Sequence, residues 1–203
     1  GKVKYKCRTS PGKAGDRTQI RGISGRERLP WQTRPAANRG KENMNMSMHI
    51  VLVEPEIPPN TGNIARSCAA TGSVLHLVKP LGFSIDDRSL KRAGLDYWPY
   101  VTLEVHESLD RFMEKYGKSD RRMFLATTKG GRLYTDVRFR DEDMILFGRE
   151  TAGLPRSFIA EHREETVRIP MSADTRLRSL NLANSVNIIL FEALRQQGFP
   201  GLK

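Results

Sequence analysis

Three short segments of the 203-residue chain combine amide, hydroxyl, carboxylate and guanidinium side chains with glycine or proline. They are residues 60–72, 148–155 and 179–184. Amides and hydroxyls can order a loop or a substrate through hydrogen bonds, and a guanidinium can bind a phosphate through parallel N–H groups. In the second segment two glycines lie close to a carboxylate, which indicates backbone that approaches a ligand. The three segments are therefore candidates for one ligand site.

Each segment also has a purely structural explanation. Asn60 suits the N-cap of a helix, and Gly72 suits the left-handed position after its end. An isolated arginine such as Arg66 most often makes a surface ion pair. Gly153 can simply shape a turn while Glu150 caps a helix. No single segment establishes a site, so their positions relative to the predicted strands decide the matter.

Apolar, β-rich runs alternate with helical patterns, which predicts an α/β fold with a mostly parallel sheet flanked by helices. Five strands and a weaker sixth are expected, at residues 49–53, 74–78, 123–127, 144–147, 166–169 and, more weakly, 101–105. Helices are expected at residues 60–71, 84–92, 108–116, 156–161 and 182–197. All three polar segments then lie where a strand passes into a helix. In an open parallel sheet this edge forms the usual ligand crevice.

The last predicted helix has one broad apolar face, which packs either on the sheet or on another subunit. This face holds Leu182, Val186, Ile189, Leu190, Ala193 and Leu194. Asn184 and Asn187 interrupt the same helix, and buried amides need hydrogen-bond partners. Ser179 or Asn181 is expected to cap the helix.

Most of the formal charge of +11 lies in the first 45 residues. They hold 12 Lys and Arg against three acidic residues and show no period of 2 or 3.6, so we expect residues 1–48 to be a disordered tail. Two origins stay open, a natural basic arm that binds phosphate and an extension foreign to the natural protein. Residues 49–203 are expected to form the folded domain. Beyond the first 45 residues the chain has 22 basic and 20 acidic residues, so bulk charge is weak evidence for RNA binding.

Several function classes lack their signatures in this sequence. No run of about 20 apolar residues and no secretory signal is present, so we expect a cytoplasmic protein without membrane contact. Cys7 and Cys68 support neither a disulfide framework nor a zinc site, and no metal is expected. The chain has no G-x-G-x-x-G after a strand, no P-loop and no H-E-x-x-H, which argues against a dinucleotide-binding enzyme.

The order and spacing of three motifs resemble the SPOUT (trefoil-knot) methyltransferases. The motifs are PPNTGNIARSCAATG from Pro58, LFGRETAGLP from Leu146 and RSLNLANSVNIILFEAL from Arg178. LDYW from Leu95 and TTKG from Thr127 add a resemblance to the small tRNA 2'-O-methyltransferases that modify the pyrimidine at the anticodon wobble position. The resemblance covers His49 to about Gly201. It implies a deep C-terminal trefoil knot, an exception to the rule that chains are not knotted.

The resemblance further implies S-adenosylmethionine as cofactor, tRNA as substrate and a homodimer. By position, the cofactor pocket maps to Ala126, Gly148, Ile169 and Ser179, with mainly backbone contacts. The chain departs from the family in two places. Ala152 stands where relatives commonly have Arg, and residues 177–178 look like a short insertion before Ser179.

The motifs also imply roles for individual side chains. The catalytic group is Arg66, Ser179, Asn181 and Glu150. In related enzymes the arginine that matches Arg66 is assigned as general base, yet a guanidinium stays protonated at physiological pH. We therefore expect Arg66 to bind the adjacent RNA phosphate and orient the ribose, while a phosphate or Ser179 relays the proton. Asn60, Asn63, Glu150 and Asn181 would order the loops.

Substrate contacts are expected from Asn60, Asn63, Arg66, Arg88 and Arg92. The basic cluster at residues 88–92 precedes Tyr97 and Trp98, which suits phosphate contact and base stacking. A solvated helix face beside core aromatics explains the same pattern equally well. Two alternative functions remain: a ribosomal RNA 2'-O-methyltransferase, and a noncatalytic RNA-binding protein with the same fold.

Overall fold

In the part of the chain that the structure describes, seven strands form one sheet in the order β3-β2-β1-β6-β4-β7-β5, and every pair of neighbours runs parallel. The computed structural model describes residues 47–84, 95–174, 176 and 179–203. The strands are β1 His49–Val53, β2 Val74–Val78, β3 Thr102–His106, β4 Met123–Ala126, β5 Arg132–Leu133, β6 Met144–Phe147 and β7 Thr166–Arg168. The predicted α/β class with a mostly parallel sheet is confirmed.

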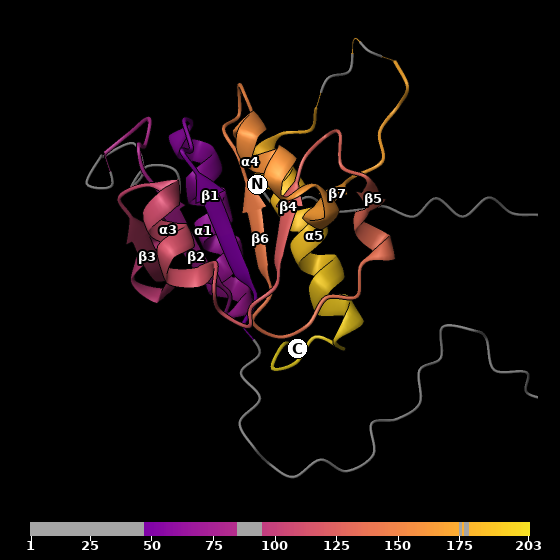
Figure 1. Cartoon of the computed structure of the whole chain (residues 1–203). Coiled ribbons are helices and arrows are strands. Elements are labelled where there is room, and N and C mark those ends of the chain that lie inside the picture. Colours follow the sequence, from indigo (N-terminus) through magenta and orange to yellow (C-terminus); the bar gives the residue numbers. More distant parts are fainter. Residues whose placement is uncertain (1–46, 85–94, 175, 177–178) are drawn as a thin grey trace, which may run out of the picture. The chain divides into compact units, whose positions relative to one another are not determined.

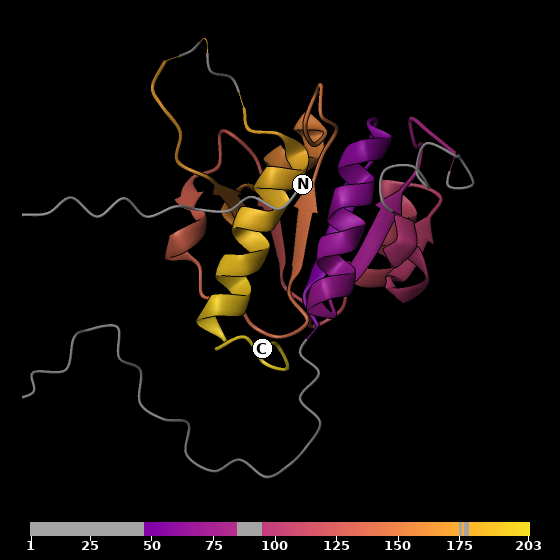
Figure 2. The same ribbon diagram turned by 180° about the vertical axis from the view of Figure 1, so that it is seen from behind.

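Helices cover both faces of this sheet (Figures 1 and 2). The α-helices are α1 Pro58–Thr71, α3 Leu109–Tyr116, α4 Arg156–Glu161 and α5 Leu182–Gln196. Short 3-10 helices lie at Leu95–Tyr100, Tyr134–Asp136 and Arg163–Glu165. Figure 2 shows α1 and α5 on one face, whereas Figure 1 shows α3 and α4 on the other. Among the helices that the structure describes, none has the length and apolarity to span a membrane.

Burial on both faces explains why the central strands are continuous apolar runs. Along β1, Ile50 and Leu52 pack in the same core as α1 and α5, while Val51 and Val53 pack against α3 and α4. Successive side chains of a strand point to opposite faces of the sheet, so the residues of β1 alternate between the two cores. Cys68 of α1 is a fully buried core residue, as expected. Met48 is also fully buried, so the folded part includes this residue just before β1.

Most predicted element boundaries agree with the structure to within one or two residues. Strand β5 was not predicted, because two residues are too short to show a period. Helix α1 begins at Pro58 instead of Asn60, since proline fits the first helical turn, where no N–H partner is needed. The helix expected at residues 84–92, with Arg88 and Arg92, lies largely outside the described residues. The same holds for residues 1–46 of the expected tail.

The last helix resolves two alternatives left open by its sequence. Asn181 is the N-cap, because its side-chain oxygen accepts from the backbone N–H of Ala183 and of Asn184 at 2.9 and 3.3 Å. Most of the broad apolar face is buried within the chain and joins the core on the α1 side of the sheet. It therefore packs on the sheet and leaves only other parts of α5 for contact with another subunit.

Candidate active site

The predicted cofactor-binding positions meet at the carboxyl edge of three adjacent strands. Ala126 ends β4, Gly148 directly follows β6, and Ile169 directly follows β7. These strands are neighbours in the order β6-β4-β7. Because parallel strands end at the same edge, their following loops can form one crevice. Ser179 is exposed two residues before the N-cap of α5.

The carboxylate of Glu150 joins the second polar segment to the first. Its Oε2 accepts from the backbone N–H of Glu56 at 2.9 Å, and its Oε1 accepts from the backbone N–H of Ile57 at 3.2 Å. The side-chain amide of Asn60 donates to the same Oε1 at 3.0 Å. An anion at this position is favourable, since the first N–H groups of a helix lack intrahelical partners.

Asn60 then links this pair to the third polar segment. The side-chain amide of Asn181 donates to Oδ1 of Asn60 at 2.9 Å, across 121 positions of sequence. Asn60 is 6 % exposed, and its side chain does not cap α1. The predicted N-cap role for Asn60 is wrong, because Ile57 is the N-cap and the prolines place Asn60 inside the first turn. The three segments are thus held together by one chain of hydrogen bonds, Glu150 to Asn60 to Asn181.

A second set of contacts, which the sequence analysis missed, strengthens the same junction. Thr151 donates to the carboxylate of Glu56 from its backbone N–H at 3.1 Å and from its hydroxyl at 2.8 Å. Arg149 forms an ion pair with Glu54, whose φ of 53° is left-handed. A non-glycine residue in this region costs about 1 kcal/mol or more and is frequent at functional sites. The signal was available, since Glu54 and Glu56 directly follow an apolar strand.

The two glycines of the second segment have different structural reasons. Gly153 has a φ of 70°, and its backbone pairs with Arg149 in both directions, at 2.9 and 3.2 Å. A Cβ atom on Gly148 would lie 2.0 Å from the carbonyl carbon of Gly153. Residues 148–153 therefore close into a tight turn that tolerates no side chain at Gly148.

The exposed side of α1 presents Asn63 and Arg66. The guanidinium carbon of Arg66 lies 4.8 Å from the ring centroid of Tyr97, which is 42 % exposed. This cation–π contact brings the predicted Arg66 and the LDYW motif together. Arg88 and Arg92 lie outside the described residues, so their predicted substrate contacts stay predictions.

The asparagines inside α5 have different environments. Asn184 is exposed, so the expectation that it is buried and needs a partner is wrong. The side-chain oxygen of Asn187 is buried and has no hydrogen-bond partner among the described residues. Thr61 of α1 also has a buried hydroxyl without a partner among them.

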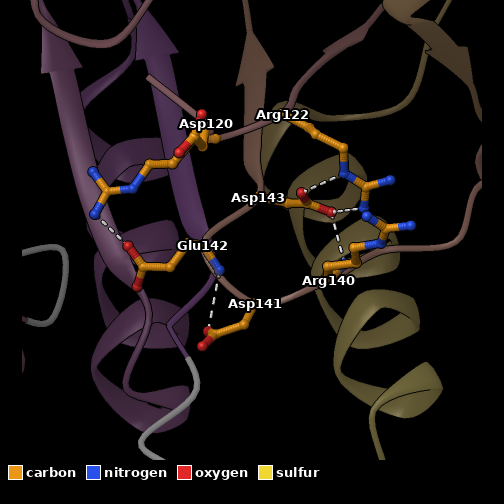
Figure 3. A pocket seen from close by; sticks show the side chains of 7 residues that line it. Asp120, Arg122, Arg140, Asp141, Glu142 and Asp143 are labelled. Carbon is orange, nitrogen blue, oxygen red and sulfur yellow. Dashed lines mark hydrogen bonds and ion pairs between the residues drawn. The ribbon is translucent and has the colours of Figure 1, made fainter.

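Two hollows of the described structure lie away from the cofactor-binding positions. One, of about 280 Å³, lies at the amino ends of β4 and β6 and is lined by paired charges (Figure 3). There Arg122 contacts Asp143 at 2.6 and 2.9 Å, and Arg121 pairs with Glu142. The other, of about 550 Å³, is lined by residues around α3 and α4 and includes Glu54. Ala126, Gly148, Ile169 and Ser179 line neither of them.

Comparison with known proteins shows that the chain matches a family model and is similar to several known proteins. Residues 47–191 match the model of the SpoU rRNA Methylase family. The chain is 51 % identical over 156 residues to the tRNA (cytidine(34)-2'-O)-methyltransferase of Methylovorus glucosotrophus, covering 75 % of this chain and 97 % of that protein. The match lies in the folded part of the chain.

Two solved structures share the fold. One, from work on the 2-OH methylation of C/U34 on tRNA, has a TM-score of 0.71 and 45 % identity and covers 76 % of this chain and 98 % of that chain. The other is the SpoU methyltransferase AviRb of Streptomyces viridochromogenes in complex with the cofactor AdoMet. It has a TM-score of 0.64 and 26 % identity, covering 73 % of this chain and 60 % of that one.

The hydrogen-bond chain from Glu150 to Asn181 generates a stability prediction. Glu150→Ala leaves the buried amide of Asn60 without its acceptor, so it should lower the free energy of unfolding by about 1–3 kcal/mol. Asn60→Ala in the same background should cost less than in the wild-type chain, with a coupling of about 0.5–3 kcal/mol. Urea unfolding of the two single variants and the double variant measures both quantities.

Glu164→Ala is the matched control, because Glu164 is exposed and should change stability by less than about 0.5 kcal/mol. Additive effects of Glu150→Ala and Asn60→Ala would show that the two side chains do not act as one unit.

Proposed function

The chain belongs to the SpoU methylase family, and from this premise we propose that it transfers a methyl group from S-adenosylmethionine to a tRNA ribose 2'-hydroxyl. The proposed target is the pyrimidine at the wobble position, as in the names of its relatives. The observation that carries the proposal is the hydrogen-bond chain Glu150 to Asn60 to Asn181. It joins three motif segments at one edge of the sheet.

The residues at this edge fit S-adenosylmethionine. Loops after three adjacent strands offer backbone groups, and Gly148 presents no side chain. Met171 and Leu180, 37 % and 41 % exposed, flank these loops and would offer apolar surface to an adenine ring. We propose that Ala126, Gly148, Ile169 and Ser179 hold the cofactor. When bound, it supplies an electrophilic methyl group on sulfur.

Arg66 has the position and chemistry of a residue that orients the substrate. Its guanidinium is exposed on α1 and stacks on Tyr97, so it can present N–H groups to an RNA phosphate. Asn63 lies one turn earlier on the exposed side of the same helix and would add a hydrogen bond. We propose that Arg66 fixes the ribose and stabilises negative charge as the 2'-hydroxyl loses its proton. The RNA phosphate or the hydroxyl of Ser179 relays that proton toward solvent.

We also propose the oligomeric state and the topology that the family implies. Phe191 of α5 is 46 % exposed, and Asn187, whose side-chain oxygen has no partner among the described residues, lies one turn before it on the same side of the helix. A twofold-related subunit packed on this strip would bury Phe191 and could donate a hydrogen bond to Asn187, which supports a homodimer. The proposed knot agrees with a strand order that places β7 between β4 and β5, both earlier in the chain.

The central experiment measures transfer of labelled methyl from S-adenosylmethionine to an anticodon stem-loop with cytidine or uridine at position 34. We expect one methyl group per RNA, located at that ribose by mass spectrometry of nuclease fragments. A stem-loop with 2'-deoxyribose at position 34 is the matched control and should accept none. Equal transfer to the deoxy control would show that the 2'-hydroxyl at position 34 is not the methylated group. Preferred transfer to ribosomal RNA fragments would favour the alternative substrate, and no transfer to any RNA would favour a noncatalytic protein.

Alanine substitutions at two glycines in loops that follow strands test the proposed cofactor site. Gly148→Ala should abolish S-adenosylmethionine binding, because the added Cβ would collide with the backbone of Gly153. Gly131→Ala should leave binding unchanged, since its Cβ would meet only the hydroxyl of Thr166 at 3.9 Å. Isothermal titration of both folded variants measures the difference. Unaltered binding in Gly148→Ala would remove this loop from the cofactor site.

Substitutions at Arg66 distinguish positioning from simple charge. Arg66→Lys keeps the charge but loses the planar fork, so the single-turnover rate constant of methyl transfer should fall by about 10- to 100-fold. Tyr97→Phe keeps the ring under the guanidinium and should retain turnover, whereas Tyr97→Leu should lower it. Single-turnover methylation assays give these rates. Full activity of Arg66→Lys would show that two parallel hydrogen bonds from the guanidinium are not needed.

A further inference from the structure

Three histidines form a row across adjacent strands on the α3 side of the sheet. His49 of β1, His76 of β2 and His106 of β3 are all buried. Nδ1 of His49 lies 2.8 Å from Nε2 of His76, and Nδ1 of His76 lies 3.1 Å from Nε2 of His106. The rings stack at centroid distances of 5.1 and 5.3 Å.

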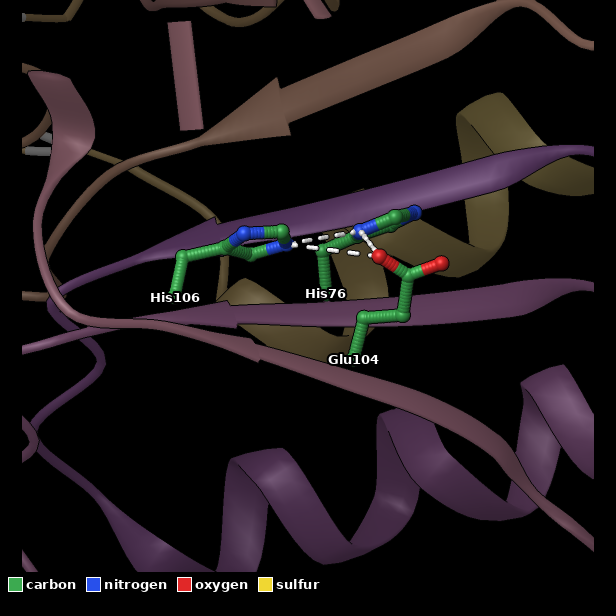
Figure 4. Close-up of side chains that lie close together, drawn as sticks. All are labelled: His76, Glu104 and His106. Atoms are coloured by element: carbon green, nitrogen blue, oxygen red, sulfur yellow. Dashed lines mark hydrogen bonds and ion pairs between the residues drawn. The ribbon is translucent and has the colours of Figure 1, made fainter. Parts of the chain in front are cut away.

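Glu104 of β3 completes a convergent group with two of these rings (Figure 4). Its Oε2 lies 3.8 Å from Nδ1 of His76 and 3.9 Å from Nε2 of His106. A point equidistant from the three atoms lies about 2.1 Å from each, which is the usual length of zinc bonds to imidazole nitrogen and carboxylate oxygen. We propose that His76, Glu104 and His106 form a binding site for a divalent cation of the zinc class.

The neighbours of the site support this assignment. Nε2 of His76 lies within hydrogen-bonding distance of Nδ1 of His49, and the tautomer with the proton on Nε2 leaves a lone pair on Nδ1 for a cation. Metal-bound histidines characteristically donate their other N–H in this way. The edges of Phe112 and Tyr116 contact the rings of His76 and His106 and surround them with apolar surface. Two imidazoles and one carboxylate favour zinc over magnesium or calcium, which prefer all-oxygen ligands.

Lys115 supplies a positive charge beside the carboxylate of Glu104. Its ammonium donates to Oε2 of Glu104 at 2.8 Å, and the hydroxyl of Tyr116 donates to the same oxygen at 2.8 Å. The side chain of Lys115 is 56 % exposed, so it can turn into solvent when a cation binds. Lysine and the metal ion therefore compete for one carboxylate.

The site is independent of the proposed methyl transfer. It lies on β2 and β3, which β1 separates from β6 and the cofactor loops. The zinc patterns sought in the sequence could not reveal it, because they rely on ligands that are close along the chain. Here the ligands come from two strands that the parallel sheet brings together.

Zinc titration of the full chain without a polyhistidine tag tests the proposal. Calorimetry with zinc chloride should give one ion per chain, and excess magnesium should not displace it. His106→Ala and Glu104→Gln should each weaken binding by at least about tenfold. Lys115→Met should strengthen it by about threefold or more, because the competing cation is removed. His162→Ala is the control and should bind like the wild type, since this histidine lies outside the cluster.

Absence of stoichiometric zinc binding, or equal binding by His106→Ala and Glu104→Gln, would overturn the proposal. Binding that depends on Cys7 instead, tested with Cys7→Ser, would overturn it as well. If the variants fail to fold, X-ray absorption of the zinc-loaded wild-type chain decides the question. Two imidazoles in the zinc coordination shell are expected, and a shell without histidine would refute the site.

Discussion

The carboxylate of Glu150 makes the contacts on which the arrangement of loops at the carboxyl edge of the sheet depends. It accepts from two backbone N–H groups before α1 and from Asn60, which in turn accepts from Asn181. These partners are separated by 90 and 121 positions along the chain, and the parallel sheet brings them together. Conversely, the buried amide of Asn60 would lack its acceptor without Glu150. The same hydrogen bonds therefore stabilise the fold and fix the site.

The amino edge of the sheet contributes mainly to stability, whereas the carboxyl edge carries the candidate site. At the amino edge, opposite charges such as Arg122 and Asp143 neutralise each other and tie strand starts together. In the middle of α1, Arg66 is exposed and stacked on an aromatic ring. A planar guanidinium matches the geometry of a phosphate through parallel N–H groups, and it is a poor proton acceptor. The role that we propose for Arg66 is therefore orientation of the ribose and not proton transfer.

Sequence patterns correctly predicted the strands in which every residue is buried. They missed the contacts that depend on residues far away along the chain. Strands β1, β2 and β6 were placed correctly because long apolar runs have one dominant explanation. Asn60 was assigned as an N-cap because local spacing cannot reveal Glu150, 90 residues away. The pairing of Glu56 with Thr151 was missed for the same reason. The methyl donor came from family resemblance alone, since no local pattern encodes sulfonium chemistry.

Helix α5 shows how one amphipathic pattern can mislead about assembly. Its broad apolar face is compatible with a dimer contact in the sequence, yet Val186, Ile189 and Leu190 are buried in the core of the same chain. The sheet already removes that surface from water, so the face cannot also drive association. What remains is a narrower strip with Phe191 and the buried oxygen of Asn187. Because an unpaired buried acceptor is costly, a donor from a partner subunit would add stability that apolar contact alone does not provide.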